Sequence, residues 1–72
     1  MSFNGKLITF AQARNVNPAT ATAFRARVGA VIRSAKTEQE FASQVAALAA
    51  SMGLRARLNS TATQLVIQVD PS

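Results

Sequence analysis

Positively charged side chains are the main chemical resource of this sequence. Its 72 residues include eight Lys and Arg against three Asp and Glu, which gives a net charge of +5. Most of these cations are arginine, whose planar guanidinium group makes paired hydrogen bonds to phosphate or carboxylate. Such an excess indicates an anionic partner, with nucleic acid, an acidic protein surface and anionic lipid as the candidates. The candidate contact residues are Arg25, Arg33, Lys36, Arg55 and Arg57.

The spacing of these residues predicts where they point. Residues three or four apart share one face of a helix, and this spacing links Arg25, Gly29, Arg33 and Lys36. Arg55 and Arg57 alternate with apolar residues, which predicts the outward face of a strand. We expect the helix and strand groups to join into one basic face. Gly29 costs its helix about 1 kcal/mol relative to alanine, and it leaves room for a ligand to approach the backbone.

The sequence offers little for catalysis or metal binding. It contains neither cysteine nor histidine, so the usual thiol nucleophile, general base and soft metal ligands are missing. Its acids are Glu38, Glu40 and Asp70, and no two of them are placed for acid–base work. Glycine-rich phosphate-binding motifs are also absent. We therefore expect no enzyme activity, no catalytic residue, no metal site, no cofactor and no small-molecule substrate.

The first half of the chain predicts a strand and a helix. Residues 6–11 are a short apolar run with β-branched members, which favours a strand. A helix is predicted from residue 19 to about residue 35, with Asn17 as its N-cap and Pro18 in its first turn. Its apolar residues recur at spacings of three and four, which is typical of a helix with one buried side.

The second half predicts another helix followed by a hairpin. The segment T-E-Q-E that begins at Thr37 is a capping box, in which Thr37 and Glu40 satisfy each other's backbone amides. The helix is predicted to run to about Met52 and to stop at Gly53 in a left-handed conformation. Residues 54–58 alternate between apolar and polar, and residues 64–70 place Leu65, Ile67 and Val69 on one face with Val66 and Gln68 on the other. These patterns predict two strands joined by a polar loop at residues 59–63.

These elements predict a single α+β domain over residues 1–72, in the order β-α-α-β-β. An antiparallel helix hairpin packs on a small, mostly antiparallel three-stranded sheet, with the pairing of the first strand left open. Of the four phenylalanines, Phe3 is the one that could be exposed. The expected core consists of Ile8, Phe10, Phe24, Val28, Val31, Phe41, Val45, Leu48, Met52, Leu54, Leu58, Leu65, Ile67 and Val69.

The order β-α-α-β, with Gly53 between the second helix and its strand, resembles the core of KH RNA-binding domains. The resemblance covers the element order alone. The G-x-x-G loop with which that family holds the nucleic-acid backbone is missing, because the segment between the helices reads Ser34-Ala35-Lys36-Thr37. The resemblance therefore assigns no site residue in this chain.

The second predicted helix carries no charge after Glu40. Its side away from the expected core consists of small residues, which either fill an exposed face or pack against a partner. This candidate interface comprises Ser43, Ala46, Ala47 and Ala50. Since a domain of this size has a marginal core and no disulfide or metal to reinforce it, we expect a homo-oligomer.

Two functions are consistent with these features. The first is a small non-enzymatic module that binds nucleic acid, or another polyanion, through its basic face. The second is a structural or regulatory protein-interaction subunit, such as an assembly component or a small inhibitor that docks on a larger protein. No run is apolar and long enough for a membrane span or a secretory signal, so a cytoplasmic setting is expected. The preference for arginine and alanine suggests a bacterial or phage source.

Overall fold

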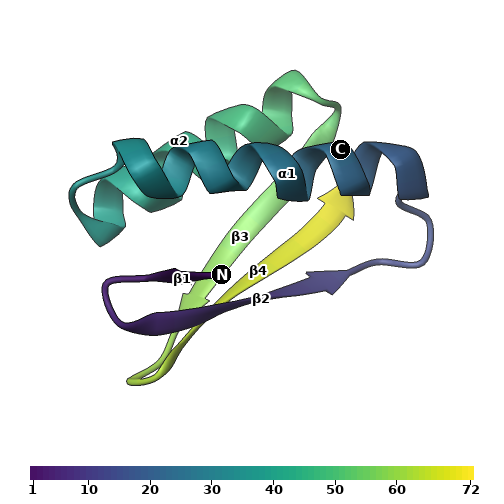
Figure 1. Cartoon of the computed structure of the whole chain (residues 1–72). Coiled ribbons are helices and arrows are strands. Elements are labelled where there is room, and N and C mark those ends of the chain that lie inside the picture. Colours follow the sequence, from purple (N-terminus) through teal and green to yellow (C-terminus); the bar gives the residue numbers. More distant parts are fainter.

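The computed structural model describes all residues 1–72 and has two helices on one side of a β-sheet (Figure 1). In chain order the elements are β1 (Ser2–Phe3), β2 (Lys6–Gln12), α1 (Pro18–Ser34), α2 (Glu38–Ser51), β3 (Leu54–Ser60) and β4 (Gln64–Pro71). The α+β class, the two helices and the C-terminal hairpin are confirmed. Neither helix has the length and apolar character needed to cross a membrane.

The sheet differs from the prediction in the number of its strands. It has four strands in the order β1-β2-β4-β3, one more than expected. The additional strand, β1, is only two residues long, so it contains no alternating pattern that could reveal it. The central pair, β2 and β4, is parallel, whereas β1–β2 and β3–β4 are antiparallel. The helix hairpin and β3 lie between β2 and β4 in the chain. They bring the chain back to the end of the sheet where β2 begins, so that β4 can run parallel to β2.

The helix ends follow the predicted capping chemistry with one shift. Asn17 caps α1, because its side chain accepts hydrogen bonds from two first-turn amides at 2.9 and 3.2 Å. Thr37 caps α2 by accepting from the Glu40 amide at 3.0 Å. The carboxylate of Glu40 accepts from the Lys36 amide at 3.1 Å, one residue before the expected partner. Gly53 follows α2 at φ +73°, where a side chain would be strained.

The core lies between the helices and one face of the sheet. Every residue expected in it is either buried or half-buried against the buried cluster. The helix stripes and the alternating strand residues account for this agreement, because burial of one side is what produces both patterns. The buried residues outside the expected set are Phe3, Val16, Ala21, Ala35 and Ala49.

Phe3 is the main correction to the predicted core. Its ring stacks on Phe41 of α2 with centroids 4.7 Å apart, and only 6% of the residue is exposed. β1 positions this ring, because Phe3 pairs with Lys6 across the β1–β2 turn. The turn itself contains two residues with positive φ, Asn4 and Gly5. This turn reverses the chain, so that β1 pairs with β2 (Figure 1) and the Phe3 ring reaches Phe41 of α2.

Candidate functional site

The structure separates the five candidate basic residues into two groups. Arg55 and Arg57 are exposed on β3, whose alternate residues Leu54, Ala56 and Leu58 face the helices. Because side chains alternate along a strand, these arginines lie on the face of the sheet that carries no helix (Figure 1). On that face Arg55 lies opposite Asp70 of β4. The other candidates lie in α1 and in the loop that follows it. The single basic face expected from the sequence is thus divided by the sheet.

Arg25 occupies the side of α1 that faces β2. Its guanidinium donates to the Gln12 side chain at 3.0 Å and lies 5.3 Å from the centre of the Phe10 ring. The opposite side of α1 is marked by Ser34, whose hydroxyl donates to Gln44 of α2 at 2.9 Å. Arg25 is therefore held at the outer edge of the helix layer, with its cation still exposed to solvent.

Arg33 and Lys36 extend the basic surface toward the end of α1. Arg33 follows Arg25 by two turns, about 12 Å along the axis and about 80° around it. Lys36 lies two residues beyond the end of α1, and both side chains are exposed. We call Arg25, Arg33 and Lys36 the α1 basic face. The carboxylate of Glu40 approaches this face, but it bonds the backbone amide of Lys36.

The cations of the α1 basic face are not neutralised by ion pairs. The structure contains two salt bridges, one between Lys6 and Glu38 and one between Arg57 and Asp70. The first joins atoms 3.1 Å apart, whereas the second spans 3.8 Å and leaves the Arg57 side chain 66% exposed. Two of the three acids are thus engaged away from α1.

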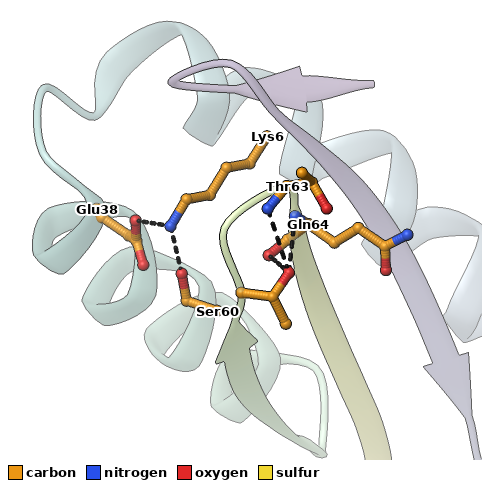
Figure 2. Close-up of polar contacts among 6 residues, drawn as sticks. Lys6, Glu38, Ser60, Thr63 and Gln64 are labelled. Atoms are coloured by element: carbon orange, nitrogen blue, oxygen red, sulfur yellow. Dashed lines mark hydrogen bonds and ion pairs between the residues drawn. The ribbon is translucent and has the colours of Figure 1, made fainter.

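A polar cluster that the sequence did not reveal joins β2, α2 and β3. The Lys6 ammonium donates to the Glu38 carboxylate at 3.1 Å and to the Ser60 hydroxyl at 2.6 Å (Figure 2). Because Ser60 accepts this bond, its own hydroxyl hydrogen is free for Glu38. The hydrogen bond from Ser60 has the largest effect and the one from Lys6 the next largest, and both lower the pKa of the Glu38 carboxyl from its ordinary value of 4.5. The partners are 32 and 54 residues apart in the chain, so local spacing contains no signal for the cluster.

This cluster predicts a pH-dependent part of the stability. Since folding lowers the pKa of Glu38, its ionised form stabilises the folded state at neutral pH. The contribution is complete above about pH 4.5 and disappears as the pH falls through the lower folded-state value. Glu38→Gln is therefore expected to lower the urea midpoint at pH 7, with the difference from wild type shrinking toward pH 3. A constant difference across this range would show that Glu38 acts through something other than its charge.

Gly29 lies in the middle of the α1 basic face, between Arg25 and Arg33. A Cβ atom built on Gly29 meets nothing within 4 Å, so no packing requires glycine there. Gly29→Ala is expected to raise the free energy of unfolding by about 0.5–1 kcal/mol, because alanine is the better helix former. Urea denaturation with an unchanged m-value measures this gain. A loss of stability would indicate a contact that the folded chain does not show.

The small residues of α2 lie on its outer side, as expected. All four, Ser43, Ala46, Ala47 and Ala50, are exposed. They leave this side of α2 uncharged, while the opposite side supplies Phe41, Val45 and Ala49 to the core. Nothing within the chain covers the face. Self-association through it stays a prediction, which light scattering over a range of concentrations tests.

The molecule has no pocket, and all the candidate residues lie on open faces. Comparison with protein families, with curated proteins and with solved structures finds nothing that matches this chain. The likeness to KH domains therefore stays one of element order. Functional inference rests on the geometry and charge of the faces described above.

Proposed function

We propose that this protein binds the phosphate backbone of nucleic acid, or a similar polyanion, through the α1 basic face. The proposal is carried by the absence of an ion-pair partner for Arg25, Arg33 and Lys36, all of which are exposed. Solvated cations on one surface bind phosphate mainly by releasing the counterions condensed on the nucleic acid. Such contacts do not depend on base sequence, so the protein would act as a non-enzymatic binding module.

The gap at Gly29 supports the same proposal. The helix keeps a glycine at a position where nothing in the fold excludes a side chain, and this glycine lies between two of the three cations. A phosphate group can approach the backbone closely at such a position. Gly29→Ala, which retains every charge, is accordingly expected to weaken binding although it stabilises the fold.

The salt dependence of binding provides the main test. Three phosphate contacts give a slope of about −2.7 in a plot of log K against log salt for duplex DNA, or a loss of about 40-fold between 50 and 200 mM salt. Fluorescence anisotropy with labelled duplex and single-stranded oligonucleotides measures both quantities. The double variant Arg33→Gln/Lys36→Gln leaves one contact, so the slope is expected to become shallower, at about −0.9.

The arginines of the sheet supply a charge-matched control. Arg55→Gln/Arg57→Gln also removes two positive charges, but from the opposite side of the sheet. The proposal predicts that this variant keeps the wild-type slope. Equal losses of affinity in the two double variants would mean that binding depends on net charge and not on the α1 basic face. Salt-insensitive binding, or no binding at low salt, would refute the proposal.

A second function, docking on another protein, is favoured by the outer edge of β3. This strand ends the sheet and carries two exposed arginines, one of which has no acid within 4.0 Å. The edge is also free of the α1 basic face, so the two functions can be tested separately.

A further inference from the structure

β3 presents a long unpaired edge. It is the last strand in the order β1-β2-β4-β3, so its seven residues pair on one side only. It contains no proline, and its residues remain in register with β4 over the whole strand. An edge of this kind is a template on which another extended segment can form hydrogen bonds.

The bonds beyond the two ends of β3 show which of its backbone groups are free. Thr61 donates its amide to the Gln64 carbonyl at 2.8 Å, beyond one end. Ser72 donates its amide to the Gly53 carbonyl at 3.2 Å, beyond the other. Both bonds lie in the β3–β4 register, so the odd-numbered residues of β3 bond β4 and the even-numbered ones point outward. The outward backbone groups belong to Leu54, Ala56, Leu58 and Ser60.

The side chains of the edge select a charged partner. Arg55 and Arg57 are exposed on the open face of the sheet, at positions where an added antiparallel strand brings its own side chains closest. The acid near them is Asp70 on β4, which approaches Arg57 only to 3.8 Å. Acidic residues at alternate positions of an added strand would lie directly opposite both arginines.

A second copy of this chain fits the edge poorly. If two β3 strands pair antiparallel with full overlap, Arg57 lies opposite its own copy. A shift of two residues toward Leu54 sets Arg55 opposite the other copy's arginine at position 57, whereas a shift toward Ser60 sets Arg57 opposite Asn59 and leaves a shorter overlap. Like charges directly opposite each other destabilise a strand pair. The arginines thus oppose the pairing between copies that has full overlap, and they favour an acidic strand.

The helix side of the edge accepts apolar side chains. Ala56 and Leu58 are half-buried there, beneath α2. Since Gln44 marks the side of α2 that meets α1, Ala42 and Ala46 lie on the other flank, above the outer edge of β3. The residues of an added strand that alternate with its acids would meet this uncharged surface.

From this geometry we propose that β3 binds an extended peptide of another protein, in which acidic and apolar residues alternate, as an added antiparallel strand. The peptide's backbone pairs with the even-numbered residues of β3. Its acids contact Arg55 and Arg57, and its apolar residues lie against α2. The proposal goes beyond polyanion binding and does not depend on it, because none of these groups belongs to the α1 basic face.

Amide hydrogen exchange with a probe peptide tests the proposed pairing. The probe is a capped peptide in which two glutamates alternate with three valines between polar ends. At a free concentration ten times its Kd, exchange at the Ala56 and Leu58 amides is expected to slow about tenfold. The Arg55 and Arg57 amides already bond β4 and should change much less. No protection at Ala56 and Leu58, or protection centred on α1, would overturn the proposal.

Matched variants separate strand docking from the polyanion proposal. Arg55→Gln/Arg57→Gln is expected to lower the affinity for the glutamate peptide by about 2- to 30-fold, because two cross-strand charge pairs are lost. A peptide with lysine in place of glutamate should bind the wild-type protein even more weakly than the glutamate peptide binds the double variant. Arg33→Gln/Lys36→Gln should leave peptide affinity unchanged while it reduces oligonucleotide binding. Equal affinity for the lysine and glutamate peptides would exclude an acidic partner.

Discussion

Phe41→Ala is expected to remove about 3–5 kcal/mol from the free energy of unfolding. Phe41 is fully buried at the start of α2, and its ring stacks on Phe3 at 4.7 Å. Truncation leaves a cavity in the core and removes the ring on which Phe3 stacks. A 72-residue domain has a total stability of about 4–11 kcal/mol, so this change removes a large part of it. Urea denaturation followed by far-UV circular dichroism measures the loss.

Phe41→Leu provides the control for this prediction. Leucine retains much of the apolar volume, so its cost is expected to be clearly smaller than that of alanine. Phe10 offers a second comparison, because it is only half-buried and contacts Phe24 edge-on, with ring centroids 6.3 Å apart. If Phe41→Ala lowered stability by less than 1 kcal/mol, the ring could not be part of the core as described.

The sequence predicted those parts of the fold that depend on local periodicity. The stripe through Phe24 and Val28 and the alternation through Leu65 and Ile67 both arise because one side of an element is buried. Caps act over three or four residues, so Asn17 and its helix could be recognised directly. The structure also confirms that Arg55 and Arg57 point away from the core, as their alternation indicated.

The sequence could not predict features that depend on long-range pairing. Whether β2 pairs with β3 or β4 depends on which partner covers more apolar surface, and this cannot be read from either strand alone. The same limit applies to the basic surface. Helical spacing predicts that Arg25 and Arg33 share one side of α1, and both residues are exposed. It contained no information about which side of the sheet the helix would cover, and therefore about where Arg55 would lie.

The division of the cations changes what the protein can bind. A continuous face including all five residues would contact one polyanion along its length. In the observed arrangement, Arg25 and Arg33 lie on a folded helix surface, whereas Arg55 and Arg57 lie on the open face of the sheet beside a free strand edge. Phosphate backbones match the former because exposed cations attract them without any contact to the bases. Extended peptides match the latter because the strand also supplies backbone donors and acceptors.

Phe3→Ser is the second substitution expected to have a large effect, at about 2–4 kcal/mol of unfolding free energy. If Phe3 were exposed, the change would cost at most about 0.5 kcal/mol. The structure instead buries the ring against Phe41 and ties the segment to β2, where the Ile8 amide donates to the Met1 carbonyl at 2.9 Å. Loss of the ring should therefore release β1 as well as open the core.

Amide exchange at Ile8 distinguishes these two effects. When β1 separates from β2, the Ile8 amide loses its partner and its exchange should accelerate more than that of the central β4 amides. Leu7→Ser is the matched control, because Leu7 is 50% exposed on the sheet face away from the helices. It should cost much less and leave Ile8 protected. Equal costs for the two serine variants would mean that β1 adds no core, and the stability of the domain would then rest on the two helices, β2 and the C-terminal hairpin.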